Sequence, residues 1–418
     1  MIRNKAYYLL VAVFLIGCKS LQIKKELKSE FLENQFTGIY VYDLESEKVI
    51  LNYNGDKYFT PASNTKIFTL FTGLSVLSDS IPAFKYAVNK DTIIIQGTGD
   101  PSFLHPFFKD STALKMAKKY KKVKIITNNI SDERYGPGWA WEDFGRYFSP
   151  ERSAFPMYGN VVSIKNKKNG FNIPPKFFNK NLKITHKGYR REEFTNTFYY
   201  GKNRMREAKI PMIIDSNLTA NLWNDLLPNK VELIRSSNLK LSKFAYSISA
   251  DSLYTRMMKE SDNFLAEQLL VLVSSTLSDT LNTSNARKFI LENELKELNQ
   301  KPRWVDGSGL SRYNLFTPNS FVHVLTKMYQ KIPKERLFSF LSVGGESGRL
   351  KNWFFGKDNP YVYAKSGSLG NNYNLSGYLI TDSGKVLAFS YMNNHFMSSS
   401  SKIKEKMQVV LEEIRVNF

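Results

Sequence analysis

The sequence has little cysteine and little histidine: Cys18 is the single cysteine, and there are four histidines in 418 residues. A lone cysteine cannot form a disulfide within the chain. The histidines are scattered, and none forms a pair with metal-ligand spacing, at positions 105, 186, 323 and 395. A zinc peptidase therefore has little support, and no G-x-S-x-G stretch follows a strand. We expect neither a metal nor a cofactor.

Long apolar segments are also missing after the N-terminus, so no later segment is expected to cross a bilayer. The apolar run Ala6 to Ile16 follows a short basic start with Arg3 and Lys5. This run is too short for a comfortable membrane span and is typical of an export signal. The pattern predicts a signal peptide over residues 1–17.

The end of this signal resembles a bacterial lipoprotein box, Leu15-Ile16-Gly17-Cys18, in which the cysteine is lipidated and becomes the new N-terminus. We therefore expect a lipidated Cys18, followed by a tether over residues 18–30, that holds the protein to a membrane. Lys19 follows the cysteine and favours the outer membrane of a Gram-negative cell over the inner one. The predicted location is the cell envelope, facing the periplasm.

Acidic residues are scarce relative to basic ones, which gives a formal net charge of +21. Removal of the signal would lower this charge to about +19, which is still strongly basic. Basic runs such as KMAKKYKKVK (115–124) would attract polyanions. No nucleic-acid-binding module is recognisable, and an exported protein would not meet nucleic acid. Anionic lipid or cell-wall material fits better, although an ordinary solvated surface explains any single run.

The pattern of apolar residues predicts one α/β (α+β) domain with an interruption. Residues 36–59 alternate apolar and polar side chains, as in a β-hairpin, and lead into a buried helix. Short strand-like pieces separated by Gly, Asn and Pro then follow, before helical periodicity returns near residue 250. We predict a catalytic domain formed by residues 31–88 and 241–418, with a β-rich inserted domain at 89–240.

The stretch TPASNTKIFT (60–69) places Ser63 three residues before Lys66 at the expected start of that helix. Residues three apart share a helix face, so the lysine can lean over the serine. The simpler interpretation is that Ser63 caps the helix and Lys66 lies on the surface. Ser237/Lys240, Ser399/Lys402 and Ser401/Lys404 have the same spacing. The pair by itself is weak evidence for a catalytic site.

Two further motifs follow in the chain. Ser261-Asp262-Asn263 lies in a helical segment, and Lys365-Ser366-Gly367 directly precedes an alternating strand. S-x-x-K, S-D-N and K-T-G are together the motif set of penicillin-binding proteins and class A β-lactamases. Here the three occur in that order, in helix, helix and strand contexts, so chance is a poor explanation.

Longer strings make the resemblance narrower. The sequence is similar to class C low-molecular-weight penicillin-binding proteins, the D-alanyl-D-alanine carboxypeptidase/endopeptidase family, in GTGDPSF (97–103), GPGWAWEDFGRYFSPERSA (136–154), ESDNFLAEQLL (260–270), VDGSGLSRYNLFTP (305–318) and KSGSLGNNYNLSGYL (365–379). This resemblance implies a transpeptidase/β-lactamase-like domain, with an antiparallel sheet between helical layers and an insertion between the first two motifs. The insertion is short for the family, so one inserted subdomain is expected to be reduced or missing.

The resemblance also implies roles for the motif residues. Ser63 would be the nucleophile, and Lys66 its base if burial and nearby positive charge, for which Lys365 is a candidate, lower the lysine pKa. Ser261 would relay a proton to the departing amine. Asn263 would hold either the Lys66 amine or the substrate amide, whereas Asp262 is expected to point elsewhere, without a chemical role.

The remaining residues are expected to bind the substrate. Backbone N–H groups of Ser63 and Ser368 would form the oxyanion site. The expected substrate contacts are Lys365, Ser366, Gly367, Asp143, Phe148 and Arg312. Ser366 stands where the family usually has threonine. For Asp143, Phe148 and Arg312, a packing or salt-bridge role is an equal alternative. The implied partners are peptidoglycan stem peptides as substrates and β-lactams as inhibitors.

Two alternatives remain at this point. A β-lactamase-like hydrolase needs a deacylating glutamate, but in ELKELN (294–299) the corresponding position is Leu295, so we interpret this stretch as an ordinary helix. A non-catalytic lipoprotein that binds peptidoglycan would be favoured by the loss of a motif, and none is lost. The sequence leaves open whether the enzyme trims a terminal D-alanine or cuts a cross-link.

Overall fold

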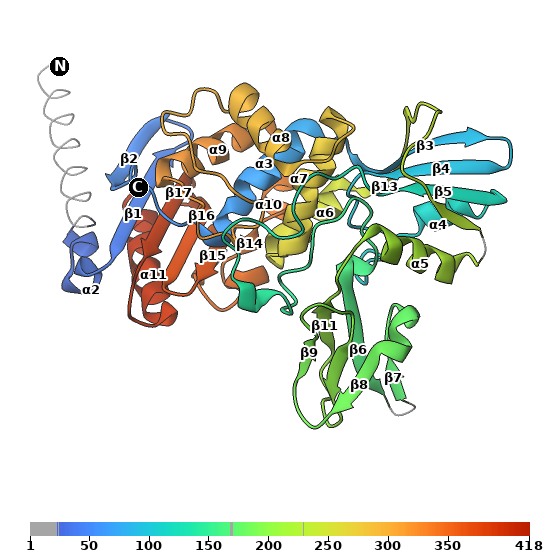
Figure 1. Cartoon of the computed structure of the whole chain (residues 1–418). Coiled ribbons are helices and arrows are strands. Elements are labelled where there is room, and N and C mark those ends of the chain that lie inside the picture. The colour runs from blue at the N-terminus through green and yellow to red at the C-terminus, as the bar shows by residue number, and fades with distance from the viewer. Residues whose placement is uncertain (1–22, 24, 168–169, 229) are drawn as a thin grey trace, which may run out of the picture.

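The computed structural model describes residues 23, 25–167, 170–228 and 230–418 (Figure 1). The predicted signal peptide and Cys18 lie outside these residues. Part of the predicted tether does lie within them, and it packs on the body of the protein: Ile23 and Leu27 are buried, and Glu26 pairs with Lys406. Leu27, the single apolar side chain of residues 25–30, is therefore covered by the body of the protein, and the extent of the tether stays a prediction.

The larger part of the chain is built on a six-stranded antiparallel sheet with the order β14-β15-β16-β17-β1-β2. Its strands are β1 (Phe36–Asp43), β2 (Lys48–Tyr53), β14 (Ser342–Val343), β15 (Val362–Leu369), β16 (Asn372–Ile380) and β17 (Val386–Asn394). The predicted hairpin pairs as β1 and β2, and β1 also pairs along its whole length with β17. The two ends of the chain thus complete one sheet.

Helices cover both faces of this sheet (Figure 1). The central strands β16 and β17 are buried almost throughout, as expected when both faces are covered. One face packs against α3 (Lys66–Val76), α6 (Ala250–Lys259), α7 (Asn263–Leu277), α8 (Thr283–Phe289), α9 (Pro318–Lys331) and α10 (Lys334–Ser339). The other face packs against α11 (Ser400–Asn417) and the segment that includes α2 (Glu30–Glu33). The predicted antiparallel sheet between helical layers is confirmed.

The helical prediction for ELKELN was wrong. The helix α8 continues into a π-helical turn, η5 (Ile290–Glu294), and the chain then turns. Leu295 is buried in the helical core because it packs inward at this turn.

A five-stranded mixed sheet with the order β12-β5-β4-β3-β13 lies beside this layered part. Its strands are β3 (Ser80–Asn89), β4 (Thr92–Gly97), β5 (Lys122–Ile126), β12 (Val231–Leu233) and β13 (Lys243–Ser249). The same part of the chain includes the helices α4 (Thr112–Ala117) and α5 (Ser216–Leu226). The strands β3 and β13 pair with each other, so the sheet begins before and ends after the predicted boundaries of 89 and 240. The division of the chain into domains itself stays a prediction.

Two three-stranded sheets form the lobe at the bottom of Figure 1, with the orders β11-β6-β7 and β8-β10-β9. Their elements are β6 (Val161–Lys167), β7 (Gly170–Asn172), η4 (Lys176–Asn181), β8 (Leu182–Thr185), β9 (Tyr189–Arg191), β10 (Phe198–Gly201) and β11 (Ala208–Pro211). Buried side chains of this lobe, such as Ile164 and Tyr200, belong to the same core as Trp223 of α5. The segment between the first two motifs therefore contains two β-rich parts.

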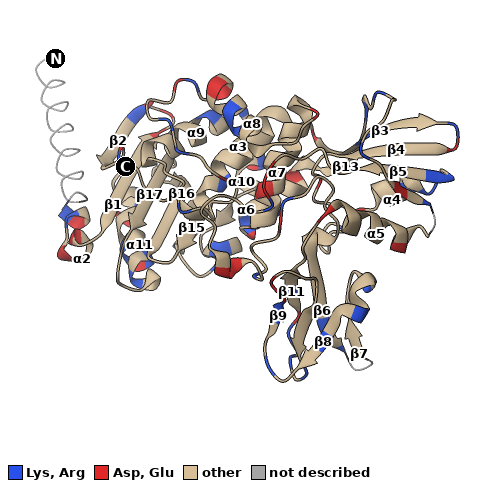
Figure 2. Ribbon diagram, viewed as in Figure 1, with Lys and Arg blue, Asp and Glu red and all other residues tan. Residues whose placement is uncertain are grey.

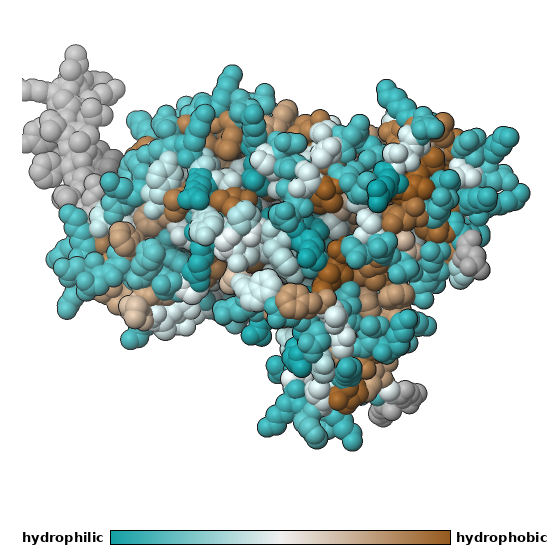
Figure 3. Space-filling model, viewed as in Figure 1, coloured by the Kyte–Doolittle hydropathy of each residue, from teal (hydrophilic) through white to brown (hydrophobic). Residues whose placement is uncertain are grey.

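Basic side chains occur along the five-stranded sheet and the lower lobe (Figure 2). The visible face is largely hydrophilic, with apolar groups gathered where these two parts meet (Figure 3). Within the described ranges, no helix is both long and apolar enough to span a bilayer.

Candidate active site

Ser63 lies on a tight turn, η1 (Ala62–Thr65), immediately before α3. It caps neither element, and Lys66 is fully buried, so the simpler interpretation of this pair is wrong. Two glycines press on the turn: a Cβ at Gly367 would lie 2.4 Å from Pro61 O, and one at Gly309 would lie 1.8 Å from Ala62 O. These close approaches hold the turn that carries Ser63 between β15 and the loop around residue 309.

The Lys66 amine has three hydrogen-bond partners. Its Nζ lies 2.7 Å from Asn263 Oδ1 and 2.7 Å from the carbonyl oxygen of Ser308, and 3.1 Å from Ser63 Oγ. The first two partners are acceptors only, so a neutral amine donates both of its protons to them. Its lone pair then faces the Ser63 hydroxyl, which is the arrangement of a base with its nucleophile.

Burial lowers the pKa of the Lys66 ammonium to about 8, against the opposing attraction of Asp306 and Glu267. The positive charge of Arg349 lowers this pKa further. Lys365 is itself buried, and burial together with Lys66 and Arg349 lowers its pKa well below the ordinary value.

We expect the rate of Ser63 acylation by a β-lactam to rise with pH, to reach half its maximum near the Lys66 pKa of about 8 and to level off at higher pH. Only the neutral Lys66 amine can accept the serine proton, and its fraction grows as the pH passes through the pKa of about 8. Stopped-flow acylation rates between about pH 6 and 10 measure this profile. A rate that stays flat or falls over this range would show that another group is the base.

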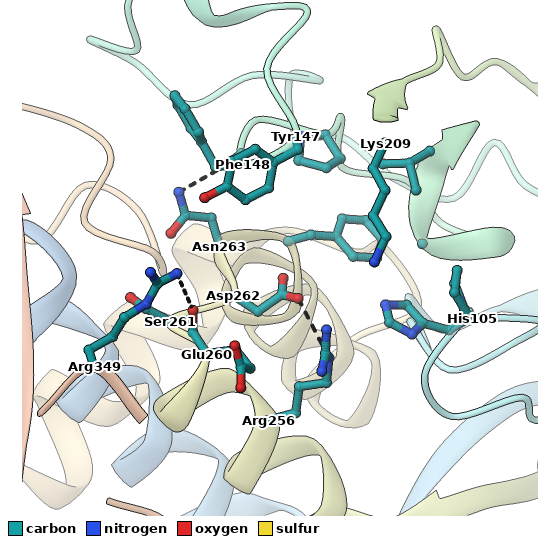
Figure 4. Close-up of a pocket in the computed structure, with 15 residues that line it drawn as sticks. His105, Tyr147, Phe148, Lys209, Arg256, Glu260, Ser261, Asp262, Asn263 and Arg349 are labelled. Atoms are coloured by element: carbon teal, nitrogen blue, oxygen red, sulfur yellow. Dashed lines mark hydrogen bonds and ion pairs between the residues drawn. The ribbon is translucent and has the colours of Figure 1, made fainter. Parts of the chain in front are cut away.

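Ser261 and Asn263 lie at the break between α6 and α7. Ser261 adopts a φ of 58°, an uncommon left-handed conformation that turns the chain between the helices. Asp262 caps α7 by accepting a hydrogen bond from Leu265 N at 3.2 Å. Asn263 uses Oδ1 for Lys66 and donates from Nδ2 to the carbonyl oxygen of Phe148 at 3.0 Å (Figure 4). Of the two predicted partners of Asn263, this structure has the lysine amine.

The third motif lies on β15. Strand β14 pairs with β15 only at Tyr363 and Ala364. Residues 365–369 pair with β16 on one side, and no described strand pairs with them on the other. Successive strand residues point to opposite faces, and Ser366 and Ser368 both line the cavity described next. Lys365 does not line it: its Nζ donates to the carbonyl oxygen of Ser366 at 2.6 Å.

Gly367 lies at a close approach between β15 and the turn of Ser63. The Cα of Gly367 lies against Pro61 and Asn64 and does not line the cavity, while its predicted contact with substrate stays a prediction.

A cavity of about 640 Å³ brings most of the predicted residues together. Those that line it are Ser63, Asp143, Phe148, Ser261, Asn263, Arg312, Ser366 and Ser368. Sequence reasoning missed a second set that also lines it, namely Tyr147, Gly309, Leu310, Arg349, Leu369, Gly370, Tyr373 and Lys404. Leu295 is not among the lining residues. The role of each lining residue stays a prediction.

A buried ionic network beneath the cavity was also missed. Glu267 accepts hydrogen bonds from Arg152 Nη2 and from Ser308 N, both at 2.7 Å. Asp306 accepts from Gly309 N at 2.8 Å and from the Trp139 indole at 2.9 Å. These carboxylates fix the loop whose Ser308 carbonyl binds Lys66. The sequence feature that could have indicated this network is Glu267, which lies four residues after Asn263 in ESDNFLAEQLL.

This arrangement suits acyl transfer, because a nucleophile and a free strand edge meet in one cavity and a buried amine of lowered pKa lies beside the nucleophile. Among the described residues, no three His, Cys, Asp or Glu side chains are placed to hold a metal ion together.

Residues 20–183 and 244–414 match the D-Ala-D-Ala carboxypeptidase 3 (S13) family. The chain is 24% identical to D-alanyl-D-alanine carboxypeptidase DacB of Haemophilus influenzae, over 91% of this chain and 90% of that protein. The fold is similar to that of H. influenzae penicillin-binding protein 4, with a TM-score of 0.72 and 20% identity over 94% of this chain and 97% of that one.

A second similar structure is that of the Bd0816 predatory endopeptidase of Bdellovibrio bacteriovorus, with a TM-score of 0.52 and 15% identity, over 91% of this chain and 93% of that one. The match to the H. influenzae structure spans nearly its full length, which gives no support to a missing subdomain relative to that protein. Since the family match covers most of the sequence and includes all three motifs, the chain belongs to the D-Ala-D-Ala carboxypeptidase 3 (S13) family.

Proposed function

We propose that the protein is a serine D-Ala-D-Ala carboxypeptidase and/or endopeptidase that acts on peptidoglycan stem peptides through an acyl-enzyme on Ser63, and that it binds penicillins there. The observation that carries this proposal is the buried Lys66 amine, 3.1 Å from Ser63 Oγ, with its other two partners both acceptors. H. influenzae penicillin-binding protein 4 has been solved in complex with a β-lactam, which supports the penicillin-binding part of the proposal.

In the proposed reaction, neutral Lys66 takes the Ser63 proton while Oγ attacks the carbonyl carbon of the penultimate D-alanine. The backbone N–H groups of Ser63 and Ser368 stabilise the oxyanion, with each donor contributing about 3 kcal/mol. As the C–N bond breaks, the proton passes through Ser261 to the leaving amine. Water then adds to the acyl-enzyme, and Ser63 leaves as a protonated hydroxyl, which restores the enzyme.

The unpaired edge of β15 would align the substrate. A peptide lying along residues 365–369 can form main-chain hydrogen bonds like those of an added strand. The Ser366 hydroxyl would bind the carboxylate of the leaving residue, and Arg349, which lines the same cavity, adds positive charge. Lys365 would act from beneath the cavity floor, because its side chain is buried.

Digestion of purified peptidoglycan tests the reaction. Released D-alanine identifies a carboxypeptidase, and separated cross-linked dimers identify an endopeptidase. If neither product forms, and penicillin leaves Ser63 unmodified, the proposed function is wrong.

Ser366 allows a test of how the leaving carboxylate is held. We expect Ser366→Ala to lower acylation efficiency roughly tenfold to hundredfold, because a hydrogen bond to a charged group is worth about 1.5 to 3 kcal/mol. Ser366→Thr keeps the hydroxyl and should stay near wild type. The acylation rates of both variants with one β-lactam test whether the Ser366 hydroxyl is required. An alanine variant that is faster than the threonine variant would show that size, not the hydroxyl, matters here.

We further propose that the protein is a lipoprotein anchored through Cys18 and facing the periplasm, more consistent with the outer membrane because Lys19 follows the cysteine. The support is the apolar run that ends in Leu15-Ile16-Gly17-Cys18. Burial of acyl chains in the bilayer would supply the anchoring free energy.

Replacement of Cys18 by serine is expected to prevent lipid attachment and to shift the protein to the soluble fraction. Fractionation and intact-mass measurement of Cys18→Ser and wild type check this outcome. A variant that remains in membranes after a high-salt wash would contradict the anchor.

A further inference from the structure

A second, smaller cavity of about 180 Å³ adjoins the active-site cavity (Figure 4). We call it the side pocket. The two cavities share one wall, made of Tyr147, Phe148, Ser261, Asn263 and Arg349. The opposite wall comes from the inserted segment and includes His105 and Lys209, and α6 supplies Arg256. A water molecule takes about 30 Å³ of liquid, so the side pocket has room for a carboxylate and the carbon atoms that carry it.

Two hydrogen-bond donors of residues that line the side pocket have no hydrogen-bond partner among the described residues. His105 is 93% buried, since only 7% of its surface is exposed, and its Nδ1 accepts a hydrogen bond from Phe107 N at 3.1 Å. The neutral ring therefore carries its proton on Nε2, for which the described residues provide no acceptor. The Arg256 Nε is likewise buried without a hydrogen-bond partner, 4.0 Å from the Asp262 carboxylate.

The charge of the side pocket favours an anion. Lys209 of β11 points into it and forms no ion pair within the described part of the chain (Figure 4). Arg349 donates to the carbonyl oxygen of Glu260 at 3.1 Å and keeps its charge beside the shared wall. Three cationic side chains thus face two carboxylates, Glu260 and Asp262. A lysine without an ion pair, together with two N–H groups that lack hydrogen-bond acceptors, is suited to binding a carboxylate, although Arg256 also pairs with Asp262.

The position of Ser261 indicates which part of a substrate would enter. Ser261 belongs to the shared wall and, in the proposed mechanism, gives its proton to the departing amine. Whatever is attached to that amine therefore lies beside the entrance to the side pocket. A single D-alanine has only one carboxylate, which Ser366 would already hold. A cross-linked substrate has a second stem peptide on this amine, and such peptides carry further carboxylates.

We propose that the side pocket binds a carboxylate of the leaving peptide of a cross-linked substrate, through Lys209, Arg256 and His105. This inference rests on the proposed function. It gives the protein a dedicated subsite for the cleavage of cross-links. Lys209, Arg256 and His105 determine substrate choice and take no part in acyl transfer.

The experiment compares kcat/KM for three substrates: a cross-linked muropeptide dimer, the same dimer with the carboxylates of its leaving peptide amidated, and an uncross-linked pentapeptide. Amidation should lower the wild-type value for the dimer about tenfold or more, since a charge-assisted bond is lost. Lys209→Met should cause a similar loss with the free-acid dimer, remove the effect of amidation, and leave pentapeptide hydrolysis and β-lactam acylation unchanged. The control is Lys165→Met, an exposed lysine on the neighbouring strand β6 outside the pocket, which should behave like wild type.

Two results would overturn the inference: equal losses for dimer and pentapeptide in Lys209→Met, or an amidation effect that persists undiminished in this variant. A wild-type enzyme that hydrolyses the pentapeptide but not the dimer would also overturn it, while the proposed function would stand. Failure of the function itself has a separate signature, since wild type would then cleave neither substrate and Ser63 would gain no penicillin adduct.

Discussion

Replacing Ser63 with alanine is expected to abolish covalent labelling by penicillin. The Ser63 hydroxyl is the group that faces the lone pair of Lys66, at 3.1 Å, so its removal leaves the base without a nucleophile. Loss of the nucleophile in a serine hydrolase costs about 10⁶ in kcat, which in a labelling experiment is a complete loss. Mass spectrometry of the adduct, with peptide mapping, measures the result.

The matched control for this experiment is Ser237→Ala. Ser237 has the same spacing to a lysine, Lys240, but lies in the segment between β12 and β13, outside the active-site cavity. Labelling of this variant should equal that of wild type. Undiminished label in Ser63→Ala, or label mapped to another residue, would refute the assignment of the nucleophile.

A second large effect is expected from Glu267→Gln, which removes the charge of a fully buried carboxylate. Arg152 binds this carboxylate through Nε at 3.0 Å and Nη2 at 2.7 Å, and both side chains are at most 3% exposed. Removing one partner of a buried ion pair leaves an uncompensated charge and costs about 3 to 5 kcal/mol of stability. Urea denaturation measures this free energy of unfolding.

The same variant should slow acylation, because Glu267 also holds the Ser308 backbone, whose carbonyl binds Lys66. Glu232→Gln is the control for charge removal alone. Glu232 pairs with Lys124 at 3.3 Å on the surface, where it is 61% exposed, and such pairs contribute about 0 to 1 kcal/mol. If the two variants lose equal stability, the buried network does not support the site as described.

Local patterns in the sequence predicted the first hairpin, the helix after Ser63 and the order of the motifs, whereas the antiparallel sheet between helical layers was implied by the resemblance to a known family. Alternation in residues 36–59 predicted the hairpin of β1 and β2, and the buried helix after Ser63 is α3. These features depend on neighbours in the chain, so periodicity records them. The end of α8 was missed because a π-helical turn leaves no periodic signal.

The sequence by itself determined the family and the three motifs, because residues close together in the chain carry that information. Only the tertiary structure decided how they work together. It placed Lys365 under the cavity, made Gly367 a packing contact of the Ser63 turn, and added Arg349. The Arg152–Glu267 pair, 115 residues apart, and the side pocket likewise exist only after folding. Their energies come from burial and from partners distant in the chain, which no local pattern of residues encodes.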